Sequence, residues 1–421
     1  MPRNFSTLKA AIGPGLLMAG AAVGVSHLVQ STRAGAEYGL AMLGFIVLGL
    51  LAKYPFLEFG PRYASATGEH LIAGYRRLGR WASALFLVIT VATMFTVLAT
   101  VTLVTAGLVG SVFGLGWSIS QLAAVTLTAC VAVLAIGHYR GLDLLMKIIM
   151  AVLAVATLAA VVLAWRAVPH TASLWPNLGD PALRTGATLA FVLALLGWMP
   201  IPLDAAAWHS LWTLERARDT GIRPSPRHAT IDFAIGYIGA GVLALAFLAL
   251  GALMIYGTGK LLPGSAVAFA TMLIDLYPQS LGAWARPVIA TAALATMLST
   301  TLTVADAYPR VLCAYLNRHD RRPEDKRPGQ PVYLAALLIV AIGAWLVIDR
   351  FGDLFTTLID FTTTVSFLSA PVIGWLNLRL MSLPHLPPEA RLGRAMKLWS
   401  VAGLVFLTLF SLVWLAWRVI G

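Results

Sequence analysis

The chain has 421 residues, of which 59% are hydrophobic and 11% are charged, and its formal net charge at pH 7 is +12. Soluble globular proteins are about 25% charged, so this composition excludes a soluble enzyme or binding module and indicates a polytopic membrane protein. The positive charge alone is compatible with nucleic-acid binding, but its distribution along the chain favours contact with anionic lipid. We expect no nucleic-acid partner.

Apolar runs of about 20 residues are long enough to cross the hydrocarbon core of a bilayer. The breaks between such runs predict an all-α protein with about eleven transmembrane helices, in a single transmembrane domain that covers residues 1–421. The predicted spans are 12–36, 38–59, 81–110, 117–137, 141–165, 186–212, 230–256, 286–309, 332–348, 354–377 and 397–417.

The basic residues predict the orientation of these spans. With the N-terminus in the cytoplasm, 23 of the 30 Lys and Arg residues fall on the inner side. Such a bias is what the positive-inside rule requires. We therefore expect a multi-pass protein of the cell membrane, that is a plasma or inner membrane, with its N-terminus inside.

Two of the predicted spans are interrupted. The first contains Gly24, Ser26 and His27, and the sixth contains Pro200 and Pro202 within "LLGWMPIPLDAAAWHSLW". Two prolines so close together cannot both lie inside a continuous helix. Broken membrane helices are tolerated where neighbouring protein satisfies the freed backbone groups or where the break lines a watery cavity.

The two interruptions are five spans apart, which is typical of transporters built from two inverted repeats. We predict a first repeat over about 10–165, a second over about 186–380, and an extra helix at about 397–417. In such proteins the substrate site lies between the two broken helices, near the membrane centre.

Several short motifs resemble a known family. The stretches "GPGLLMAGAAVGVSH" and "AGAEYG" resemble the first helix of the Nramp divalent metal ion transporters, and "RYASATG" resembles the segment after their second helix. The stretch "LSTTLT" is similar to part of their eighth helix. The resemblance covers most of the chain and implies the LeuT-type fold, with divalent metal ions as substrates.

The chain departs from this family at its metal-binding motifs. Where the family has an Asp-Pro-Gly-Asn motif in helix one, this chain has Gly24, Val25, Ser26 and His27. In the family's Met-Pro-His motif of helix six, Met199 and Pro200 are kept and Ile201 replaces the histidine. A second possible alignment places Asp204 at the position of the family's histidine. The third span also lacks the acidic residues that line the family's proton path.

The candidate ligands follow from chemistry and from this alignment. A carboxylate near the middle of the bilayer is costly unless it has a partner or faces water, which makes Asp204 the leading candidate for a metal ligand. The imidazole of His27 and the thioether of Met199 are softer donors that suit transition metals. Gly24 and Ser26 would contribute through the unwound backbone of the first span.

A second set of polar residues lies nearer the membrane surfaces. Asp360 and Thr363, in a hydroxyl-rich tenth span, are predicted to line the outer vestibule or the substrate site. His209, Arg33 and Glu37 are candidates for gating, with packing between tryptophans as the alternative for His209 and a surface ion pair for the other two.

A further pair, Lys53 and Glu58, is predicted to anchor the second span at the interface, because long charged side chains reach toward lipid headgroups.

These patterns predict a secondary active transporter that moves a divalent metal ion by alternating access, with coupling to a proton or another cation left open. The alternative is a small organic solute, because the helix-one aspartate of the family is replaced by Gly24. We find no phosphate-binding loop, zinc-protease helix or nucleophile elbow, so we expect neither an enzyme nor a bound cofactor.

Overall fold

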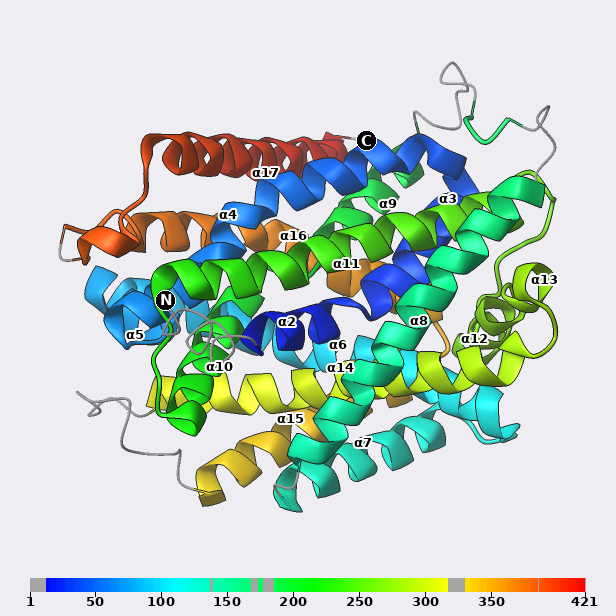
Figure 1. Ribbon diagram of the computed structural model, residues 1–421, viewed down its shortest axis with the longest axis horizontal. Helices are drawn as coiled ribbons and strands as arrows, with labels where there is room; N and C mark the ends of the chain where they lie inside the picture. The colour runs from blue at the N-terminus through cyan, green and yellow to red at the C-terminus, as the bar shows by residue number, and fades with distance from the viewer. Residues whose placement is uncertain are drawn as a thin grey trace, which may run out of the picture.

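The computed structural model describes residues 13–136, 139–167, 173–176, 185–316, 330–384 and 386–420, and side chains are described throughout these ranges except at residues 139–147 and 149. Within them the chain is helical and contains no strand. The helices run side by side through the molecule, with α4 (Leu43–Thr67) and α17 (Arg394–Ile420) along one edge and α7 (Ile119–Ile136) and α15 (Gln330–Phe351) along the opposite one (Figure 1).

The observed helices follow the predicted spans closely. The third span is α6 (Arg80–Phe113), the fifth is α8 (Tyr139–Ala167) and the seventh is α11 (Pro226–Met254). The eighth is α14 (Ala285–Leu316) and the tenth is α16 (Phe355–Leu380). Among the described residues, nine helical stretches are long and apolar enough to cross a membrane.

Both spans predicted to be interrupted are divided into shorter helices. The first consists of α2 (Pro14–Ala22), a π-helix over Ser26–Ser31 and α3 (Thr32–Tyr38). The sixth consists of α9 (Gly186–Gly197) and α10 (Ala205–Thr220), separated by residues 198–204.

The structure also contains short helices where the sequence predicted only loops. They are α5 (Leu71–Leu78), α12 (Ala266–Asp275), α13 (Pro278–Leu281) and a 3-10 turn over Pro388–Ala390. A second 3-10 turn, Gly39–Met42, forms the start of the predicted second span.

The broken helices lie in the interior of the bundle. In Figure 1, α2 lies near the centre, and α11 and α14 pack against it. Helices α11 and α14 have the largest buried shares among the candidate spans, whereas α8 and α17 have the smallest. Helix α17 exposes Leu398, Val405 and Leu412, as expected for a lipid-facing surface.

Small residues allow the central helices to approach closely. A methyl group on Gly15 of α2 would lie 2.0 Å from a backbone oxygen of α11, and one on Gly35 of α3 would lie 1.9 Å from the oxygen of Leu248 in the same helix. Close backbone contact through glycine is a main source of helix association in membranes. At the start of α2, the carboxylate of Asp232 in α11 accepts hydrogen bonds from the amides of Gly13 and Gly15 (3.1 and 2.6 Å).

Proline in α4 frees a backbone oxygen that other helices then satisfy. Pro55 has no amide proton, so the carbonyl of Leu51 has no intrahelical donor. The indole nitrogen of Trp399 in α17 donates to this oxygen at 2.8 Å. One residue earlier, Tyr237 of α11 donates to the carbonyl of Leu50 at 2.6 Å. These contacts attach α17 and α11 to α4.

Candidate functional site

The two helix breaks meet inside the bundle. The hydroxyl of Ser26, at the start of the π-helix, lies 3.2 Å from the carbonyl oxygen of Pro200 in the break of the sixth span. It also lies 2.9 Å from the carbonyl oxygen of Ala22, the last residue of α2. Ser26 is buried, and it links the two unwound segments directly. The sequence-based expectation that the breaks share one location is consistent with this contact.

Gly24 faces a threonine of α14. A methyl group on Gly24 would lie 2.9 Å from Cγ2 of Thr300, which is closer than real side chains approach. The hydroxyl of Thr300 donates to the carbonyl of Gly20 at 2.9 Å and lies 3.4 Å from that of Val23. Thr300 therefore fills the space beside Gly24 and satisfies backbone oxygens that the end of α2 leaves free.

His27 is fully buried, and both of its ring nitrogens contact the protein. Nδ1 lies 2.7 Å from the hydroxyl of Ser26, and Nε2 lies 2.9 Å from the carbonyl oxygen of Ala240 in α11. Because a carbonyl can only accept, Nε2 carries the proton. In this arrangement neither nitrogen is free for a metal ion, so the geometry does not support the predicted role of His27 as a ligand.

Asp204 lies at the start of α10 and is 5% exposed. Its carboxylate makes no capping hydrogen bond further into α10, although the amide of Ala205, the first residue of that helix, interacts with it. Its Oδ2 also accepts a hydrogen bond from the hydroxyl of Tyr308 in α14 at 3.3 Å. The positive charge of Lys53 in α4 lies within electrostatic range of this carboxylate.

The prediction that Lys53 and Glu58 anchor α4 at the interface is wrong, because both side chains are completely buried. The ammonium of Lys53 donates to the carbonyl oxygens of Leu196 and Gly197, at 2.6 and 2.7 Å, and lies 3.4 Å from that of Ile201.

Glu58 forms an ion pair with Arg62 at 2.7 Å and accepts a hydrogen bond from Thr230 at 2.6 Å. The sequence placed both residues by their distance from the ends of the span, whereas partners on other helices decide where they lie.

The remaining residues of the sixth-span break are also buried. Met199 is inaccessible to solvent and lies beside Gly49 of α4. The indole nitrogen of Trp198 donates to the hydroxyl of Ser366 in α16 at 2.8 Å. His209, one turn into α10, packs near the rings of Trp212 and Phe233. His209 therefore contacts one of the two tryptophans between which packing was predicted, and its other ring neighbour is Phe233 of α11.

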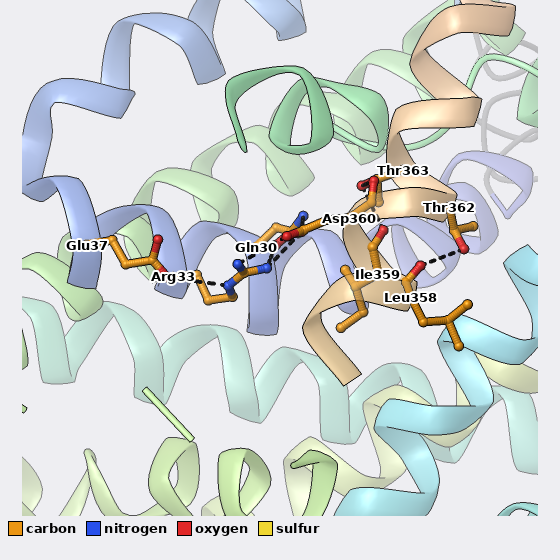
Figure 2. A network of polar contacts seen from close by, with 8 residues as sticks. All are labelled: Gln30, Arg33, Glu37, Leu358, Ile359, Asp360, Thr362 and Thr363. Atoms are coloured by element: carbon orange, nitrogen blue, oxygen red, sulfur yellow. Dashed lines mark hydrogen bonds and ion pairs between the residues drawn. The ribbon is translucent and has the colours of Figure 1, made fainter. Parts of the chain in front are cut away.

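A polar network joins the first and tenth spans (Figure 2). Arg33 of α3 donates to both carboxylate oxygens of Asp360 in α16, at 2.8 and 3.2 Å, and to the side chain of Gln30 at 2.8 Å. Gln30 in turn donates to Asp360 at 2.9 Å. Glu37 lies 3.6 Å from Arg33. The sequence identified the Arg33–Glu37 pair but missed the shorter contact with Asp360, 327 residues away.

Arg33 also touches the sixth span, since its guanidinium lies 5.1 Å from the ring centre of Phe191 in α9. Thr363, one turn beyond Asp360, is fully buried and donates to the carbonyl of Ile359 at 2.8 Å. The network therefore connects three helices on the predicted outer side of the breaks, and Thr363 lies one turn closer to them.

Hydroxyl groups line the contacts between α6, α14 and α16. Thr105 and Thr301 are 2.7 Å apart, and Thr100 donates to Thr362 at 2.9 Å. In the part of the chain that the structure describes, no three His, Cys, Asp or Glu side chains lie close enough together to hold a metal ion. Among the described residues, the polar groups near the breaks include the carboxylate of Asp204, the ammonium of Lys53, the imidazole of His27, hydroxyls and backbone oxygens.

Comparisons with known proteins agree with this architecture. The family model described as natural resistance-associated macrophage protein-like (Nramp) matches residues 15–417. An uncharacterised protein of Pasteurella multocida is 35% identical over 417 residues, which cover 97% of this chain and 92% of that protein.

Two solved structures show the same fold at low sequence identity. A manganese transporter of Eremococcus coleocola has a TM-score of 0.71 and 16% identity, over 97% of this chain and 86% of that one. MhsT in complex with L-phenylalanine has a TM-score of 0.63 and 18% identity, over 96% of this chain and 97% of that one. The fold is the LeuT-type fold, and the chain belongs to the Nramp family of metal ion transporters.

Proposed function

We propose that the protein is a secondary transporter that moves a divalent metal ion by alternating access, with Asp204 as the anionic ligand. The observation that carries the proposal is the contact of Ser26 with Pro200, which brings the two helix breaks together near the buried carboxylate. Broken helices with a buried charge between them are the usual substrate site of transporters with this architecture.

Backbone and hydroxyl oxygens would complete the coordination. The carbonyl of Gly20 has a hydroxyl partner, Thr300, whose O–H group can turn away. A metal ion that approached this carbonyl would replace a hydroxyl, whereas at Ala22 it would compete with the amide of Gly24, 2.8 Å away. Met199 would add a thioether if its side chain turned toward the break, and His27 would first have to release Ala240.

A small organic solute is the second candidate, and Lys53 is the observation that favours it. The ammonium of Lys53 partly offsets the carboxylate's charge, which weakens its attraction for a second cation. A zwitterionic or neutral solute with its own hydrogen-bonding groups would not be repelled. L-phenylalanine, which is bound in the MhsT complex, is a zwitterion held by a protein of the same fold.

Uptake into proteoliposomes tests the metal proposal. Purified protein is reconstituted around a metal-sensitive dye, and Mn²⁺ uptake is compared among wild type, Asp204→Asn and Asp275→Asn, with and without a pH gradient. Asp275 is the matched control because it is 46% exposed and pairs with Arg286 at 2.8 Å, away from the breaks. We expect saturable uptake that Asp204→Asn abolishes and Asp275→Asn leaves intact.

The pH gradient separates proton-coupled uptake from uncoupled uptake. Absence of flux for both Mn²⁺ and Mg²⁺, from wild-type protein shown to be folded by its melting transition, would refute the metal proposal. The same vesicles are then tested with radiolabelled L-phenylalanine and other amino acids. Substrate-dependent uptake there would establish the second candidate.

A further inference from the structure

The first half of the broken sixth helix ends in a cluster of backbone oxygens with few amide donors. Helix α9 ends at Gly197, so the carbonyls of Gly197 and, beyond the helix, of Ile201 have no helical amide to accept from, whereas that of Leu196 accepts from the amide of Met199 at 3.3 Å. The prolines at 200 and 202 follow directly and have no N–H groups to offer. The C-terminal end of a helix also carries partial negative charge. Together these features create a site that attracts a cation.

Lys53 fills this site from the neighbouring helix. Its ammonium has three N–H donors and three carbonyl oxygens around it, at 2.6 Å (Leu196), 2.7 Å (Gly197) and 3.4 Å (Ile201). The oxygens belong to the last two residues of α9 and to the unwound segment. The lysine thus spans the point at which the helix breaks.

Backbone clusters of this kind bind cations in other proteins of this architecture. In transporters with broken helices, the carbonyl oxygens of unwound segments and of half-helix C-termini coordinate free cations. Here those groups are engaged by a side chain of the protein itself. The buried carboxylate of Asp204, within electrostatic range, reduces the cost of burying the ammonium.

We propose that Lys53 is a tethered cation, which permanently occupies a cation-binding position at the break of the sixth helix. A free monovalent cation therefore does not bind there, and the conformational cycle does not require one at this position. The inference rests on the fold and on these contacts, and it holds for either substrate considered above.

The proposal is tested by removing the tether and supplying a free cation. In Lys53→Ala the ammonium and most of its stem are absent, which leaves space beside the three carbonyl oxygens. The thermal unfolding of purified wild type and variant is followed in lipid nanodiscs at constant ionic strength, in choline chloride and with increasing ammonium, methylammonium or sodium chloride.

We expect wild type to melt at one temperature in every salt. Lys53→Ala should melt well below it in choline and should recover by roughly 3 °C or more, saturably, with at least one small cation. Lys53→Arg, which keeps the charge, should be insensitive to the salt. Lys53→Met, which fills the space without a charge, should be destabilised and not rescued.

Three outcomes would overturn the proposal. In the first, Lys53→Ala is equally insensitive to all four salts. In the second, it fails to fold in every one of them, because then no free cation can replace the lysine. In the third, wild type is stabilised by the same cations as the variant, which would mean that Lys53 does not fill the position. Because the readout is stability, failure of metal transport does not affect the result.

Discussion

Breaking the ion pair between Arg33 and Asp360 should open the predicted outer side of the transporter. The side chains are 9% and 34% exposed, and their closest atoms are 2.8 Å apart. Exposed ion pairs contribute up to about 1 kcal/mol and disruption of buried ones costs about 3–5 kcal/mol. A half-buried pair therefore corresponds to roughly 1–2 kcal/mol, which is about a tenfold change in the ratio of open to closed states. The perturbation is Arg33→Met, which keeps the apolar stem over Phe191 but removes the charge.

Cysteine labelling can measure this shift. Thr363 is fully buried one turn beyond Asp360, so Thr363→Cys, in a background without Cys130 and Cys313, reports access from the outside. We expect a membrane-impermeant thiol reagent to label it about tenfold faster in Arg33→Met than with the arginine present. Leu261→Cys, in a loop position that is 94% exposed, is the control for reagent and sidedness. Equal labelling rates at Thr363→Cys with and without the arginine would refute the gating argument.

Three stability changes follow from other contacts. Trp399→Phe should lower the unfolding free energy by about 1 kcal/mol, because the carbonyl of Leu51 loses its donor; a melting curve in detergent that matches wild type would contradict this. Gly35→Ala should abolish the folded, monodisperse peak in size-exclusion chromatography, because the added methyl would overlap α11. Hydrogen bonds from Arg77 lower the pKa of Glu69 below its ordinary value of 4.5. Its stabilising contribution is therefore fully present above pH 4.5 and is lost as the pH falls from there through the lowered pKa of the folded state; Glu69→Gln should flatten this part of the stability–pH curve, and an unchanged slope would refute the reasoning.

The positions of the spans were predictable because they depend on local composition. A run of about 20 apolar residues has no stable alternative in the bilayer except a helix. Every predicted span corresponds to a helix or a pair of half-helices in the described residues. The two breaks were predictable for the same reason, since Pro200, Pro202 and the glycine at 24 interrupt the helix by their own backbone chemistry.

The family could also be predicted from local motifs, and the match over residues 15–417 confirms it. The departures at Gly24 and Ile201 are visible in the sequence as well. The side chain that occupies the space beside Gly24 could not be predicted from the sequence, because it belongs to Thr300, which is 276 residues away along the chain.

The chain's own sequence therefore determined its class, its spans, its breaks and its family. The tertiary structure alone decided the partners of the buried charges. From its own helix alone, Lys53 is predicted to be an interfacial anchor, but the carbonyl oxygens at the end of α9 hold it in the interior. Arg33 pairs with Asp360 more closely than with its helical neighbour Glu37. A buried charge is stabilised by whatever opposite charge or dipole lies nearest in space, and that distance is set by helix packing and not by separation along the chain.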